Sequence, residues 1–111
     1  MPVLTSKPGV LYTVISAAGF QILSALTRAA VIVGQDLEIT SACDGEHSGP
    51  EDPHHEGKAF DVRTHGLHDK HLALATIKSL LDYNKFFAWI EDEDTPNEHI
   101  HIQLRHGMVY P

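Results

Sequence analysis

Residues that could bind a metal ion gather in two segments that lie far apart in the sequence. The first is the polar stretch 44–61, DGEHSGPEDPHHEGKAFD, in which His54 and Asp61 fit the pattern H-x-x-G-x-A-x-D. The second is the segment EHIH, which ends at His101. Catalytic zinc commonly keeps three ligands from His, Asp or Glu and leaves a fourth position to water. His54, Asp61 and His101 therefore form a candidate zinc site.

The residues around these candidate ligands suit a metal centre. Gly57 lets the backbone turn tightly between the first two ligands. Ala59 lies two residues before Asp61, on the same side of a predicted strand, and its small side chain leaves room for an ion. Five of the nine histidines fall in the two segments, which favours a shared site over scattered surface histidines.

The segment 99–104, HIHIQL, alternates between polar and apolar residues and predicts a strand. Successive side chains of a strand point to opposite faces, so His99, His101 and Gln103 share one face of the sheet. The other face carries two isoleucines and a leucine, and we expect it to pack on a helix. The histidine face then lines a polar site or solvent.

The rest of the chain predicts the scaffold that positions these residues. Helical spacing of apolar residues predicts one helix between the N-cap Ser16 and the stop Gly34, and a second over 68–83 from which Lys70 and Lys78 look outward. Strands are expected at 37–43, 59–63, 86–90 and 99–104, with an extended lead-in over 1–9 and a turn at 92–97. This order predicts one α+β domain over residues 1–111, with a small, mainly antiparallel sheet packed against two helices.

Composition and charge narrow the class of protein. A chain of 111 residues with 42% hydrophobic residues is typical of a single soluble domain, and we expect a monomer. The net charge of −7 argues against nucleic acid as a partner. Polar residues interrupt the apolar stretch 10–26, so we expect no membrane insertion, and the N-terminus does not match a signal peptide. The single Cys43 excludes an internal disulfide and is expected in the core.

The two segments resemble a known superfamily. HHEGKAFD resembles the H-x-x-G-x-A-x-D motif shared by the zinc D-alanyl-D-alanine carboxypeptidases and dipeptidases and by the Hedgehog signalling domain. EHIHI resembles the closing segment of the same superfamily, in which a glutamate precedes the third ligand. The resemblance covers roughly residues 37–104. It implies a Hedgehog/DD-peptidase-like fold with Zn²⁺ held by His54, Asp61 and His101.

The resemblance also implies roles for further residues. His99, the first histidine of the H-x-H pair, would support the ligand His101. His47 resembles a Hedgehog-type histidine that approaches the centre and could polarise a carbonyl oxygen. The general base is open between two residues. Glu98 stands three residues before His101, as in the dipeptidase pattern, and is slightly favoured over Glu91, which ends FFAWIE as a Hedgehog-like glutamate does.

By this resemblance, the expected function is a zinc metallopeptidase that hydrolyses a peptide bond in peptidoglycan peptides, next to a D-amino acid. The chain departs from the family in two places. Asp52 stands where the family usually has serine, and no arginine is evident near 44–47, where cell-wall peptidases carry one for a substrate carboxylate. An endopeptidase is therefore open beside a carboxypeptidase. Arg63 and Arg105 are expected to pair with surface carboxylates.

Two other functions stay open from the sequence. One is a non-catalytic, Hedgehog-like zinc domain that binds a partner, with calcium held by the acidic run 91–94. The other is a phage structural component with a decayed site. If the chain is a peptidase, its small size suggests a phage lysis enzyme (an endolysin) that is made in the cytoplasm and then released to the cell wall.

Overall fold

The computed structural model describes residues 1–13, 15–42 and 57–105, which form a five-stranded sheet and two helices. The elements are β1 (Leu4–Ser6), α1 (Ala17–Val33), β2 (Leu37–Ser41), β3 (Ala59–Arg63), α2 (Lys70–Ser79), β4 (Phe86–Glu91) and β5 (His99–Leu104). The strand order is β1-β2-β3-β5-β4. Only the pairing of β1 with β2 is parallel among these strands. The predicted α+β fold with a mainly antiparallel sheet and two helices is confirmed.

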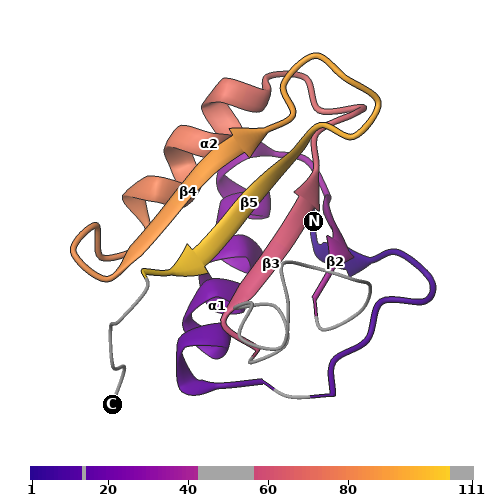
Figure 1. Ribbon diagram of the computed structural model, residues 1–111. Helices are drawn as coiled ribbons and strands as arrows, with labels where there is room; N and C mark the ends of the chain where they lie inside the picture. The colour runs from indigo at the N-terminus through magenta and orange to yellow at the C-terminus, as the bar shows by residue number, and fades with distance from the viewer. Residues whose placement is uncertain (14, 43–56, 106–111) are drawn as a thin grey trace.

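Both helices lie on one face of the sheet, behind it as drawn in Figure 1. The apolar sides of the central strands meet α1 there, and the side chains of Phe60, Val62, Ile100 and Ile102 are fully buried. The predicted packing of the isoleucine face is therefore confirmed. The opposite face of the sheet carries the histidines of β5. Among the described residues, neither helix is long and apolar enough to cross a membrane.

The predicted ends of α1 are confirmed. Ser16 caps the N-terminus, where its hydroxyl oxygen accepts a hydrogen bond of 3.0 Å from the backbone N–H of Gly19. Gly34 ends the helix with φ 73°, a left-handed conformation that glycine adopts without steric cost. The buried positions of the helix match the predicted periodicity and include Ala18, Ile22, Ala25, Leu26 and Ala29.

Two elements differ from the sequence-based expectation. The predicted lead-in contains the short strand β1, which pairs with β2 in parallel register, so its formation depends on a distant segment that local pattern does not reveal. α2 covers only 70–79 of the predicted 68–83. Asp69 caps its start by accepting from Leu72 N–H at 2.9 Å. At its other end, Asp82 accepts backbone hydrogen bonds that turn the chain into β4.

The N-terminus of α1 is fastened to the start of β3. The hydroxyl of Ser16 donates to the carbonyl oxygen of Gly57 at 2.9 Å. Gly57 has φ 68°, so the tight turn predicted at this glycine is confirmed. A side chain at Gly19 would collide with the same carbonyl oxygen. The close contact between α1 and Gly57 thus sets where the strand bearing Asp61 begins.

We expect Gly19→Ala to destabilise the protein by about 1–3 kcal/mol, because the added methyl group overlaps the Gly57 carbonyl. Helix propensity alone predicts the opposite sign, a gain of about 1 kcal/mol. Urea unfolding followed by circular dichroism measures the change. Ser24→Ala on the exposed side of α1 is the control and should not destabilise the protein. A Gly19→Ala variant that is more stable than wild type would contradict the contact.

Candidate metal centre

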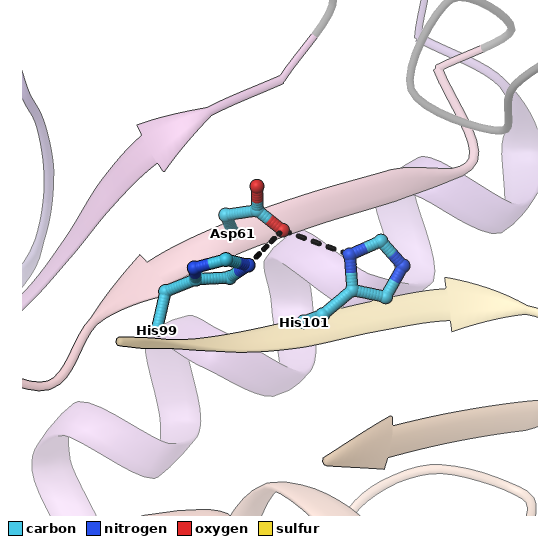
Figure 2. A group of neighbouring side chains, drawn as sticks. All are labelled: Asp61, His99 and His101. Atoms are coloured by element: carbon cyan, nitrogen blue, oxygen red, sulfur yellow. Dashed lines mark hydrogen bonds and ion pairs between the residues drawn. The ribbon is translucent and has the colours of Figure 1, made fainter. Parts of the chain in front are cut away.

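The candidate site is built by the pairing of β3 with β5. Asp61 on β3 lies directly opposite His101 on β5. On the other side of β5, Trp89 of β4 is opposite His101, and Glu91 is opposite His99. Figure 2 shows Asp61 between the two imidazole rings that rise from the neighbouring strand. The sheet register therefore brings together residues that are far apart in the sequence.

Three of these side chains have the spacing of a metal site. Asp61 Oδ1 lies 2.8 Å from His101 Nδ1 and 3.6 Å from His99 Nε2. One ligand atom from each residue lies within 4.8 Å of the others. Around a tetrahedral ion with ligand bonds of about 2.0–2.2 Å, neighbouring ligand atoms are about 3.3–3.6 Å apart. Small movements of these side chains would therefore accommodate an ion.

His101 is oriented from both sides of its ring. Its Nε2 lies 2.8 Å from Gln103 Oε1, and the amide nitrogen of Gln103 donates to the carbonyl of Leu104 at 3.0 Å. The Gln103 oxygen therefore accepts from Nε2–H, while Nδ1 faces Asp61. Burial on its own lowers the pKa of His101, but the hydrogen bonds to Asp61 and Gln103 outweigh it and raise that pKa. An imidazole whose second nitrogen is held in this way is typical of a metal ligand.

His99 can offer a lone pair to the same site when its ring is neutral. Its Nδ1 lies 2.7 Å from the carbonyl oxygen of Asn97, and donation to that carbonyl leaves Nε2 unprotonated in the neutral ring. Nε2 is buried and has no hydrogen-bond partner among the described residues. The nearest carboxylate oxygens belong to Glu91, at 3.3 Å, and Asp61, at 3.6 Å. A buried acceptor nitrogen without a donor fits a bound cation.

Glu98 lies apart from this group. One carboxylate oxygen accepts from the hydroxyl of Thr64, and the other lies 2.7 Å from Lys70 Nζ and 2.7 Å from Asp94 N. The hydrogen bond from the Asp94 backbone, together with those from Lys70 and Thr64, lowers the pKa of Glu98 to about 2. Lys70, which was predicted to look outward, is instead the ion-pair partner of Glu98. The Glu98 carboxylate thus joins the turn before β5 to the start of α2.

The other predicted site residues fall into two sets. His47, His54 and Cys43 lie outside the described residues. Glu91 is described and lies beside His99, at the edge of the candidate site. Within the described ranges, Asp61, His99 and His101 form the one group with metal-ligand spacing, and the acidic run 91–94 does not form another.

The sequence assigned His99 a supporting role, although the alternation in HIHIQL already placed it on the same face as His101. What the pattern could not supply is the hydrogen bond to Asn97, which turns the free nitrogen of His99 toward Asp61. The ring orientation, rather than the residue type, makes His99 a candidate ligand.

The two arginines differ in their surroundings. Arg63 lies 3.6 Å from Glu38, so the predicted pairing with a surface carboxylate is confirmed. For Arg105, no carboxylate partner is found among the described residues. Its guanidinium lies over the rings of Tyr83 and Phe87, at 4.9 and 5.3 Å from their centroids.

Comparison with known proteins returned no match to a protein-family model, to a curated protein or to a solved structure. The assignment of the site therefore depends on its own geometry and on the sequence motifs.

We expect the protein to bind one Zn²⁺ and His101→Gln to lose most of it, because the substitution removes a ligand nitrogen. His99→Gln should raise the Kd by about tenfold or more. Elemental analysis gives the metal content, and the fluorescence of Trp89, whose ring centroid lies 4.7 Å from that of His101, follows binding. His68→Gln, an exposed histidine outside the group, is the control. Unchanged affinity in His101→Gln would exclude this site.

We expect Glu98→Gln to lower the melting temperature near neutral pH and to have little effect near pH 2. The folded-state pKa of Glu98 lies below the ordinary value of 4.5, so its stabilising effect is present above pH 4.5 and is lost as the pH falls to about 2. Thermal melts of wild type and variant across this range measure the difference. Glu38→Gln, which alters a more exposed ion pair, should show a smaller difference. If the melting temperatures of wild type and Glu98→Gln still differ at pH 2, the stabilising effect does not come from the ionised Glu98 carboxylate.

Proposed function

We propose that the protein is a zinc-dependent peptidase that hydrolyses a peptide bond in bacterial cell-wall peptides. The observation that carries the proposal is the buried group of Asp61, His99 and His101, in which Nε2 of His99 faces the carboxylate of Asp61 and has no hydrogen-bond partner among the described residues. The motif H-x-x-G-x-A-x-D supports it by supplying His54 as a further ligand for the same ion. The resemblance to cell-wall peptidases supports the substrate class.

In this proposal Asp61, His101 and His54 hold the ion, and Gln103 keeps the ring of His101 in place. A bound zinc ion would polarise the scissile carbonyl and lower the pKa of a water molecule to about 7. With Nε2 unprotonated, His99 can join the ligands; with Nε2 protonated, it would instead orient the carboxylate of Asp61, 3.6 Å away.

Glu91 is the better supported general base. A base for this chemistry works best with a pKa near the working pH, and the pKa of Glu98 is held at about 2 by its hydrogen bonds. Glu98 is also buried against Lys70 and Thr64. Glu91 is 41% exposed and lies 3.3 Å from His99, so it can accept a proton at the edge of the site and release it to a leaving group. This reverses the slight preference for Glu98 drawn from the sequence.

We expect Glu91→Gln to lower kcat by about 10²–10⁴-fold while the zinc content stays unchanged, because the substitution removes the base but no ligand. The assay digests purified peptidoglycan with the zinc-loaded protein and identifies products by mass spectrometry. Glu93→Gln, the same change at an exposed site in the next turn, should keep wild-type activity.

Glu98→Gln, assayed well below its melting temperature, should retain activity. If it is inactive while Glu91→Gln is active, Glu98 is the base. If the wild-type protein binds zinc and leaves peptidoglycan and D-Ala-D-Ala peptides uncut, the chain is a non-catalytic zinc domain instead.

A further inference from the structure

A row of aromatic side chains leads away from the candidate metal centre along β4. The ring of Trp89 packs against His101, with centroids 4.7 Å apart, and Phe87 stacks on Trp89, also at 4.7 Å and with an interplanar angle of 14°. Phe87 in turn contacts the guanidinium of Arg105. Trp89 and Phe87, named here the aromatic row, thus connect the metal centre to a positive charge in an unbroken series of contacts.

Arg105 is held in place, and its terminal nitrogens make no hydrogen bond or ion pair with the described residues. Its Nε donates to the carbonyl oxygen of Tyr83 at 3.0 Å, and its backbone N–H donates to Lys85 at 2.7 Å. Stacking over two aromatic rings fixes the plane of the guanidinium. No carboxylate of the described residues pairs with it, although the chain carries a net charge of −7.

A cavity of about 160 Å³ adjoins this arginine. Its walls are largely apolar and include Tyr83, Phe86 and Phe87, and its charged lining residues are Lys78 and Arg105, both cationic. Like Arg105, Lys78 has no carboxylate partner in the described part of the chain. Two cations on an apolar cavity, with no acidic residue among the described lining residues, match a ligand that has a carboxylate on a short carbon chain.

We propose that Lys78 and Arg105 form a subsite for a carboxylate of the substrate peptide, which lies extended along the aromatic row. This rests on the proposed peptidase function and deepens it. Trp89 is opposite His101, and the backbone N–H of Arg105 donates to the carbonyl of Lys85, which lies four residues before Trp89 and directly precedes β4. That separation is about 13 Å at the rise of a strand, which an extended peptide covers in about four residues.

The distance decides between two substrate classes. A carboxypeptidase binds a terminal carboxylate one residue from the bond that it cuts. A carboxylate recognised about four residues away is not that terminal carboxylate, and on the leaving-group side of the bond it belongs to a chain that continues well past the bond, as in an endopeptidase substrate. The subsite therefore favours an endopeptidase that acts on acidic, extended peptides.

The test uses an N-acetylated, C-amidated D-alanine hexapeptide with one D-glutamate near its end, and the same peptide with D-glutamine. Binding to the zinc-loaded protein is followed through Trp89, the only tryptophan of the chain, and cleavage is followed by mass spectrometry. We expect the glutamate peptide to bind about tenfold more tightly, and the preference to weaken as salt is added. If Lys78 and Arg105 together create the preference for the glutamate peptide, it should be lost in Arg105→Gln and partly kept in Arg105→Lys.

Arg28→Gln is the matched control, since it removes the same charge from an exposed position on α1 and should leave the preference unchanged. Circular dichroism and a thermal melt establish that each variant is folded. If folded Arg105→Gln still prefers the glutamate peptide, the proposed subsite is wrong, even if the protein cleaves the peptide. Equal binding of both peptides overturns it as well. A preference that depends on Arg105 without any cleavage supports the subsite and overturns the peptidase function.

Discussion

The candidate site depends on the register between β3 and β5, because that register alone sets Asp61 opposite His101. A shift of one residue would turn every side chain of β5 to the other face and place the two histidines in the core. The buried row of Ile100 and Ile102 opposes such a shift, since both would move into contact with solvent or polar groups. The pairing of β3 with β5 thus sets both the apolar core on one face of the sheet and the candidate site on the other.

Both ends of this pairing are secured by contacts outside the sheet. At the start of β3, Gly57 is fixed by Ser16 at the N-terminus of α1. Beyond the end of β3, Thr64 donates to Glu98, which also accepts from Lys70 at the start of α2. The glutamate of the EHIH segment therefore holds the strand that carries the histidines. Its place in the motif would be the same for a base and for this structural role, so sequence spacing could not separate the two.

Local pattern was enough to predict much of the fold. Alternation in HIHIQL gave the correct faces of β5, and Ser16 and Gly34 gave the ends of α1. The short β1 was missed because three residues carry too little pattern, and its pairing with β2 is non-local. In the site, residue types and spacing identified Asp61 and His101. The free nitrogen of His99 and the stacked guanidinium of Arg105 depend on side-chain orientation, which no spacing encodes.

β5 lies between β3 and β4, and this position bears on which metal ion the candidate site could hold. β5 is paired on both sides, with β3 and with β4, so two ladders of backbone hydrogen bonds hold the backbone positions of its two histidines. Calcium takes six to eight oxygen ligands at 2.3–2.6 Å, whereas imidazole nitrogens suit zinc and other transition metals. If the group of Asp61, His99 and His101 holds an ion, its two imidazole nitrogens would therefore favour a metal such as zinc over calcium.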